Sequence, residues 1–252
     1  SAEYRNVTRQ ALYPQQEGNS LSGALQVSFV HEWDNGNQIF AFVPFVRRDQ
    51  HDEERSHSDI RELTWLNVAD DWELRLGIRK VFWGVTESQH LVDIINQTDL
   101  VESTDGEEKL GQPMINLALI RDWGTVDMFV LPYFRERTFP GASGRFRTPL
   151  PIDGTQAQYA SDDKQRHIDY ALRWSHYIGD LDIGLSYFNG TSRAPGFIST
   201  GTTLIPFYDQ IRQWGLDLQA TKESWLWKLE AIHHSGTMPI NDYKAATGGF
   251  EY

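Results

Sequence analysis

The chain has no cysteine, no long apolar run and no excess of positive charge, and each absence removes a class of protein. Without cysteine, neither a disulfide framework nor a thiolate metal site can form. No apolar stretch approaches the ~18 residues that a transmembrane helix needs, and the mean hydropathy of −0.50 excludes a helical membrane protein. The formal net charge of −12 argues against nucleic acid or an anionic membrane surface as the main partner.

Patterns that would indicate catalysis or metal binding are also missing. No Gly-x-Ser-x-Gly elbow is present. His233, His234 and Ser235 are consecutive, but neighbouring residues of a strand point to opposite faces, so the two imidazoles cannot converge. The eight histidines lack metal-ligand spacing with a third ligand nearby, and the acidic run at 99–108 lacks EF-hand spacing. We therefore expect no enzymatic activity, no metal and no cofactor.

What the sequence does contain is a two-residue alternation, clearest at residues 72–83 (WELRLGIRKVFW). Alternate positions are bulky and apolar on one face and charged or small on the other, namely Trp72, Leu74, Leu76 and Ile78 against Glu73, Arg75, Gly77 and Arg79. This period predicts a β-strand with one apolar and one polar side. The same alternation returns along most of the chain.

Ten strands of about 10–13 residues are predicted in this way, a length that suits a tilted membrane crossing. They cover residues 21–33, 38–47, 58–68, 72–83, 114–121, 125–136, 166–178, 181–189, 207–221 and 225–235. Tight turns at 34–37, 69–71, 122–124, 179–180 and 222–224 alternate with long loops, as in outer-membrane barrels. Many of the nine tryptophans fall near strand ends, where an interfacial aromatic girdle would lie. A soluble sandwich or propeller is the main structural alternative.

The sequence resembles Gram-negative outer-membrane β-barrels of the porin-like kind in two features: strands joined alternately by tight turns and long loops, and the block LRLGIRKVFWGVTES (residues 74–88). The block is similar to a strand-then-loop segment of several uncharacterised outer-membrane proteins. The resemblance implies one all-β domain over residues 1–252, a transmembrane antiparallel up-and-down barrel of about twelve or more strands. It also implies residence in the bacterial outer membrane, among lipid and lipopolysaccharide, with small solutes passing through.

Charged residues on the polar faces of the strands would then point into the lumen. The predicted pore-lining set is Glu73, Arg75, Arg79, Asp127, Asp169, Arg173, Asp217, Lys228 and Glu230. Such residues either set a solute preference or form a salt-bridge lattice that fills a narrow barrel, and the sequence leaves both open.

The long segment at 84–113 is the second candidate. Apolar residues at helical spacing predict one or two helical turns at 87–96, whose apolar face would bury itself in the lumen. We expect a constriction opposite a wall that includes Arg75 and Arg79, with the candidate constriction residues Glu87, His90, Leu91, Asp93, Ile94 and Ile95. A loop packed over the rim is the alternative.

A last expectation concerns the wall itself. Counting residues 1–12, the sequence predicts about eleven strands, and 248–252 begins a twelfth that is too short to cross. Because an open edge in lipid leaves backbone groups unpaired, we expect either further residues, which we favour, or a partner chain to complete the wall. A homo-oligomer is the other assembly that the sequence leaves open. The leading function is a solute channel. The alternatives are a structural or binding barrel that recognises a partner through loops 137–165 and 190–205, and a soluble Trp-rich domain that binds carbohydrate.

Overall fold

The computed structural model describes residues 1–238 and 242–252, and its regular elements are almost entirely β-strands. The helical elements are three single 3-10 turns, η1 (Asp34–Gly36), η2 (Gly154–Gln156) and η3 (Lys164–Arg166). In the described ranges, no helix has the length and apolar character needed to cross a membrane.

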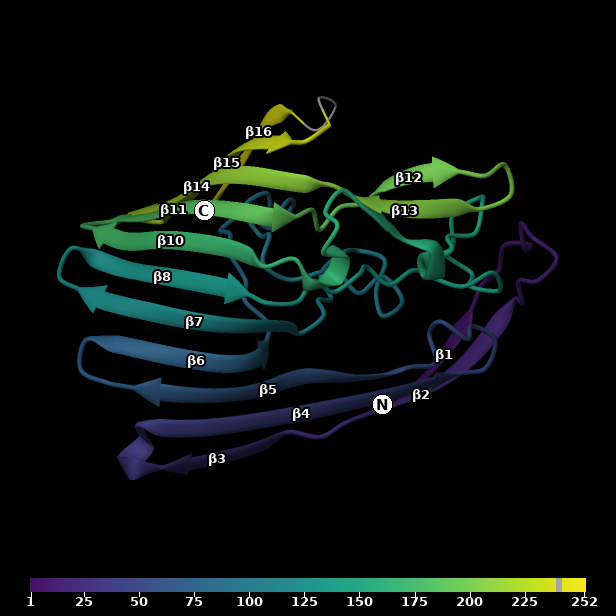
Figure 1. Cartoon of the computed structure of the whole chain (residues 1–252), viewed down its shortest axis with the longest axis horizontal. Helices are drawn as coiled ribbons and strands as arrows, with labels where there is room; N and C mark the ends of the chain where they lie inside the picture. The colour runs from purple at the N-terminus through teal and green to yellow at the C-terminus, as the bar shows by residue number, and fades with distance from the viewer. Residues whose placement is uncertain (239–241) are drawn as a thin grey trace.

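One antiparallel sheet follows the order of the chain, with β9, β12 and β13 lying outside it. Its strands are β1 (Ala2–Asn6), β2 (Asn19–Gln26), β3 (Phe29–Trp33), β4 (Gln38–Asp49), β5 (Ser58–Val68), β6 (Trp72–Arg79), β7 (Gln112–Arg121), β8 (Gly124–Leu131), β10 (Asp169–Ile178), β11 (Leu181–Thr191), β14 (Gln210–Lys222), β15 (Trp225–Gly236) and β16 (Tyr243–Glu251). Tight turns connect the strands at one end and long segments connect them at the other (Figure 1). The predicted all-β, up-and-down architecture is confirmed.

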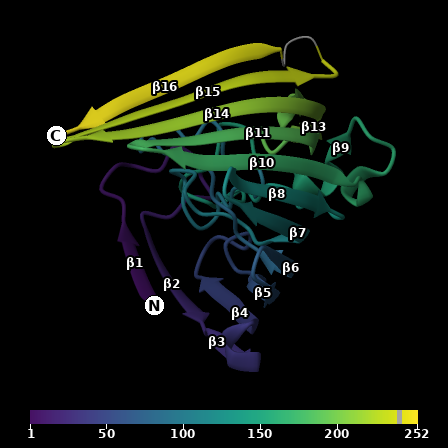
Figure 2. The same ribbon diagram turned by 90° about the vertical axis from the view of Figure 1, so that its left-hand side faces the viewer.

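The sheet curls around a central space that is occupied by the segment between β6 and β7 (Figure 2). Strands β14–β16 form one side of the curl and β2–β5 the other. The sheet stays open, because β1 and β3 form one edge, β16 forms the other, and no ladder joins the two edges in the described part of the chain.

Several strand predictions need correction. The strand expected at 72–83 ends at Arg79, the strand expected at 125–136 ends at Leu131, and the strand expected at 207–221 begins as β14 at Gln210. The strand expected at 21–33 is divided into β2 and β3, which both pair with β4. The break lies opposite Pro44, beside a register shift between Val43 and Pro44, because proline has no N–H to donate to the ladder. At the other end β16 has nine residues, not the short stretch expected at 248–252. Its Ala/Gly-rich sequence carries little apolar alternation.

Residues 137–165 and 190–205 are also more ordered than expected. They contribute β9 (Gln158–Tyr159) and β12 (Gly196–Ser199), which join β13 (Leu204–Tyr208) in a separate three-stranded sheet at the long-segment end (Figure 1). Tyr208 is fully buried in this sheet and stacks with Tyr159, while its edge-on contact with Phe134 ties the sheet to the segment that follows β8. The pairing of β9 with β13 joins residues 49 positions apart, as between Gln158 and Phe207, which local sequence patterns do not reveal.

The main sheet has the reverse of the usual polarity of a soluble protein. Large apolar side chains on its convex face are exposed, among them Trp214 (62%), Tyr170 (53%), Trp227 (50%), Leu185, Leu172 and Leu229. Polar side chains on its concave face are buried, among them Glu230, Asp169, Asn116, Asp217 and Gln213. A soluble domain buries its apolar face instead, so this sheet presents the surface that a hydrocarbon environment would favour.

Replacing Gly77 should destabilise the sheet. Gly77 has φ +129°, and an added Cβ would lie 1.9 Å from the carbonyl oxygen of Leu63 on β5. We expect Gly77→Ala to cost about 1–3 kcal/mol through backbone strain, seen as a lower urea midpoint of the detergent-folded protein. Gly23→Ala is the control, because nothing lies within 4 Å of its Cβ position. Equal midpoints for both variants would contradict the close approach of β5 and β6.

Candidate functional site

The inserted segment, residues 80–111 between β6 and β7, lies against the concave face of the sheet. Its apolar side chains form a buried cluster with those of strands β7, β8, β10, β11, β14 and β15, the members being Trp83, Val92, Ile94 and Ile95 with Met114, Phe129, Leu131, Ala171, Phe188, Ile211 and Ile232. Val92 occupies the space left by Gly215, where an added Cβ would come within 3.1 Å of it. The apolar side chains thus have partners on six strands of the wall.

Glu230 on β15 is the strongest polar attachment of the inserted segment. Its carboxylate is fully buried and accepts four hydrogen bonds from the segment. The backbone N–H groups of Val85 and Thr86 donate to Oε1 at 2.8 and 3.0 Å, the Thr86 hydroxyl donates to it at 2.8 Å, and the Val92 N–H donates to Oε2 at 3.2 Å. No ion pair of Glu230 exists among the described residues, so these donors alone compensate its burial.

These contacts explain why the helical turns expected at 87–96 are absent. Residues 87–96 contain turns and bends only. The N–H groups of Val85, Thr86 and Val92 donate to a side chain from a distant strand and not to carbonyl groups four residues earlier. The spacing of Leu91, Ile94 and Ile95 therefore reflects their burial against the concave face of the sheet and does not indicate a helix.

Two side chains of the segment fasten its base. Asn96 donates to the carbonyl oxygens of Arg79 and Leu110, both at 2.9 Å, and accepts from the Val81 N–H at 2.8 Å, so it joins the two ends of the segment. Asp93 lies 3.2 Å from the ammonium of Lys109. Burial raises the pKa of the Asp93 carboxyl despite this cation, so it accepts a proton more readily than an exposed aspartate.

The acidic side chains of the segment meet arginines other than those expected. Asp99 accepts from Arg61 on β5 at 2.6 Å, and Glu102 forms a forked pair with Arg47 on β4, the shortest distance being 2.7 Å. Arg75 pairs instead with Glu73 on its own strand. The expectation that Arg75 and Arg79 face the segment's acids is therefore wrong, because Asp99 and Glu102 pair with arginines of β5 and β4, and the earlier acids Glu87 and Asp93 pair with Lys228 and Lys109.

One cavity, the turn-side cavity, lies on the concave face between the inserted segment and the tight turns. It has a volume of about 390 Å³. Five residues of the predicted pore lining border it, together with the start of the inserted segment: Glu73, Arg75, Arg79, Asp127 and Arg173, with Val81, Phe82 and Trp83. It is thus a charged space with an aromatic patch along its inserted-segment side.

Arg173 is held firmly at the border of this cavity. Its guanidinium makes two hydrogen bonds of 2.7 Å to Asp217 on β14 and lies 5.4 Å from the centre of the Trp83 ring. The pair passes over Gly184 on β11, where an added Cβ would lie 2.3 Å from atoms of both side chains. The missing side chain at Gly184 therefore permits this ion pair across an intervening strand.

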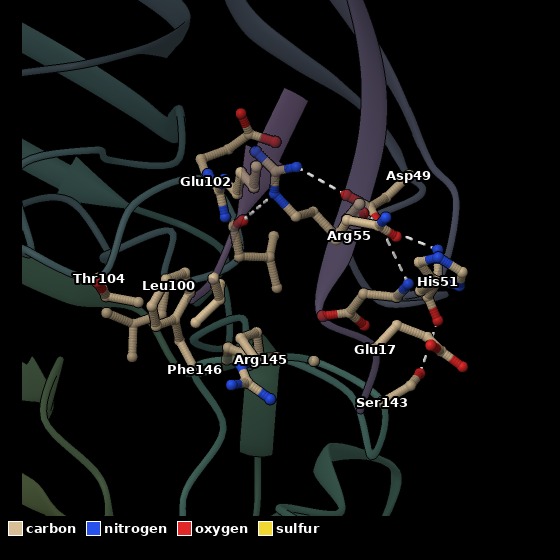
Figure 3. Close-up of a pocket in the computed structure, with 18 of the residues that line it drawn as sticks. Glu17, Asp49, His51, Arg55, Leu100, Glu102, Thr104, Ser143, Arg145 and Phe146 are labelled. Carbon is tan, nitrogen blue, oxygen red and sulfur yellow. Dashed lines mark hydrogen bonds and ion pairs between the residues drawn. The ribbon is translucent and has the colours of Figure 1, made fainter. Parts of the chain in front are cut away.

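A second cavity, the loop-side cavity of about 120 Å³, lies at the long-segment end (Figure 3). It is bordered by residues from the β1–β2 hairpin, the loop after β4, residues 100–104 of the inserted segment and residues 140–146. Arg55, in the loop after β4, donates to Asp49 at 2.8 Å, to Glu3 on β1 at 2.9 Å and to the carbonyl oxygen of Val101 in the inserted segment at 2.9 Å. The Ser143 hydroxyl donates to the carbonyl oxygen of His51 at 2.6 Å, so these segments are tied to one another. The inserted segment borders both cavities.

The remaining predicted residues lie at the sheet interior without lining the turn-side cavity. Asp169 is fully buried and pairs with Arg193, whose Nε donates to the Ile95 carbonyl oxygen of the inserted segment. Lys228 pairs with Glu87. Of the candidate constriction residues, His90 contacts Phe82 edge-on, and Leu91 packs on the buried cluster.

Sequence reasoning missed several residues that matter here. Arg47, Arg61, Asn96, Asn116 and Arg193 all connect the inserted segment or the strands that face it. Arg61 and Asn116 occupy inward positions of strands, which the alternation marks; Arg193 lies in a loop and carries no such signal. Within the described ranges, no group of three or more His, Asp or Glu side chains is arranged to hold a metal ion.

Weakening the Glu230 attachment should loosen the inserted segment. Glu230→Gln replaces one acceptor oxygen by an amide that cannot accept the same N–H groups, and each lost charged hydrogen bond is worth about 1.5–3 kcal/mol. We expect faster proteolytic cleavage within 84–92 in the folded protein. Glu223→Gln, the same change on the exposed turn of the same hairpin, should leave cleavage unchanged. An unaltered cleavage pattern in Glu230→Gln would show that the apolar cluster alone holds the segment.

Comparison with solved structures finds porins of low overall similarity. A BenF-like porin from Pseudomonas fluorescens Pf-5 aligns at 11% identity with a TM-score of 0.37, covering 92% of this chain. Two mutants of the Rh. blastica porin align at 10% and 9% identity, each with a TM-score of 0.35, covering 99% and 94% of this chain and 86% and 82% of theirs. No family model and no curated protein matches the sequence. The chain spans 64% of the length of the BenF-like porin.

Proposed function

We propose that this chain forms the wall of an outer-membrane channel for small solutes, narrowed from within by the inserted segment at residues 80–111, which contains all but the last two residues of the loop expected at 84–113. Lipid and lipopolysaccharide would surround the convex face, and solutes would pass along the concave face. The observation that carries the proposal is the reversed polarity of the sheet, with Trp214, Trp227 and Tyr170 exposed while Glu230 and Asp169 are fully buried. In water such a convex face would be a large exposed apolar patch, whereas lipid removes that cost.

Aromatic side chains at the tight-turn end support the same placement. Trp225 stacks on Trp227 with ring centres 5.6 Å apart and also contacts Phe250 and Tyr252, all near the turn end of β15 and β16. Exposed rings near the other tight turns include Trp33, Trp123 and Tyr177. Indole and phenol rings favour the boundary between hydrocarbon and water, so this band would mark the periplasmic boundary of the membrane.

The position of the inserted segment is evidence for the proposed constriction of the channel. Its first residues border the turn-side cavity and its residues 100–104 border the loop-side cavity. A solute that moves between the two cavities would therefore pass this segment. Because its attachments reach β4, β5, β10, β14 and β15, we regard it as a fixed narrowing.

The channel is tested by conductance in planar bilayers with the detergent-purified protein. The chain lacks cysteine, so Phe82→Cys gives a single thiol on the exposed Phe82 position beside the turn-side cavity. We expect discrete channel currents that fall when a bulky methanethiosulfonate reagent modifies this thiol, because the attached group occupies the path. Asp162→Cys, on an exposed loop, is the control and should be insensitive.

Two results would contradict the proposal. Absence of current from folded wild-type protein would exclude the channel and favour the binding alternative. Stability without detergent would favour the soluble carbohydrate-binding alternative.

Orientation is tested in intact cells with a membrane-impermeant maleimide. We propose that the tight turns are periplasmic, so Asp162→Cys should be labelled from outside, whereas Asn37→Cys in the first tight turn should react only after lysis. Both positions are exposed in the structure, which makes their intrinsic reactivity comparable. The opposite pattern of labelling would invert the proposed orientation.

A further inference from the structure

Two charged side chains in the turn-side cavity are unlike the others, because neither forms an ion pair within the described residues. Arg79 on β6 donates from Nη1 to the side-chain oxygen of Asn116 on β7 at 3.2 Å. The amide nitrogen of Asn116 donates in turn to Asp127 on β8 at 3.1 Å. The Asn116 amide therefore stands between a cation and an anion and keeps them apart.

The remaining charges of the cavity are already matched. Arg75 pairs with Glu73, and Arg173 pairs with Asp217. Arg79 and Asp127 have polar atoms to spare, namely Nε and Nη2 of the guanidinium and the second carboxylate oxygen, and none of these is buried without a partner. These atoms consequently open to the cavity and can receive a solute.

The charge balance around Arg79 selects among solutes. The other charged groups that border the cavity are Glu73, Arg75, Asp127 and Arg173. Because Glu73 pairs with Arg75 and Arg173 pairs with Asp217, the carboxylate of Asp127 is the charge left beside Arg79 across Asn116, and it would repel a plain anion drawn to Arg79. A solute that carries its own cation beside its anion would match both Arg79 and Asp127.

We propose that Arg79 and Asp127 form a binding site for a small zwitterionic solute of the α-amino acid class on its way through the channel. The solute carboxylate accepts from the free guanidinium N–H groups of Arg79, and its ammonium donates to the free oxygen of Asp127. Phe82, exposed at the border of the same cavity, offers a ring to an apolar solute side chain. This inference rests on the proposed channel function and deepens it by naming the solute class.

The test is the block of channel current by three matched probes: L-phenylalanine, N-acetyl-L-phenylalanine and L-phenylalaninamide. The first is a zwitterion, the second carries only the carboxylate and the third only the ammonium. We expect L-phenylalanine to reduce the current of the wild-type channel at concentrations at least about tenfold lower than either other probe, since each of these loses one charged hydrogen-bonding partner.

Variants assign the effect to the two residues. Arg79→Gln and Asp127→Asn each remove one charge while keeping a side chain of similar shape, and each should weaken the block by L-phenylalanine about tenfold. Arg121→Gln, at the tight-turn end of β7 and paired with Asp71, makes the same change in net charge as Arg79→Gln but outside the cavity. It should leave the block unaltered.

The outcomes separate this inference from the channel itself. A conducting wild-type channel that all three probes block equally, or that L-phenylalanine does not block, overturns the zwitterion site and leaves the channel standing. Stronger block by N-acetyl-L-phenylalanine would assign the cavity to anions and also overturns it. Absence of any current would contradict the channel proposal, and the zwitterion site with it.

Discussion

Every charged or polar side chain that the strands direct to the concave face must find a partner there, and most of the interior follows from this constraint. A sheet with an apolar convex face has nowhere else to place its polar residues. Burying an uncompensated charge is costly, so each one needs an opposite charge, a set of hydrogen-bond donors or water. Asp169 is matched by Arg193, Asp217 by Arg173, and Glu230 by the backbone of the inserted segment.

Two requirements of the inserted segment are met by its contact with the concave face. Its own apolar side chains require a dry surface, which the concave face provides around Phe129, Phe188 and Ile232. Its N–H groups require acceptors, because the segment forms no helix that could satisfy them, and Glu230 supplies these. Small residues make the fit achievable, since Gly215 leaves room for Val92 and Gly184 leaves room for the Arg173–Asp217 pair.

The same constraint sets apart the charged side chains that form no ion pair within the described residues. Where the interior is packed, acids and arginines are in direct contact, as between Asp99 and Arg61. In the turn-side cavity, an asparagine keeps Arg79 and Asp127 apart. The sequence left a packed lattice of salt bridges open as an alternative to a functional pore lining. Such a lattice describes one part of the interior, whereas in the turn-side cavity Arg79 and Asp127 are available to a solute.

The sequence by itself determined the strand and turn pattern, because period-two alternation is local and reports directly which side chains share a face. It placed β5 at residues 58–68, located the tight turns and identified inward charges such as Asp127 and Arg173. Only the tertiary structure decided which of these charges meet. The contact of Glu230 with Thr86 joins residues 144 positions apart, and that of Arg61 with Asp99 joins residues 38 positions apart. The conformation of the inserted segment was likewise set by these distant partners, which outweigh the local helical spacing of Leu91, Ile94 and Ile95.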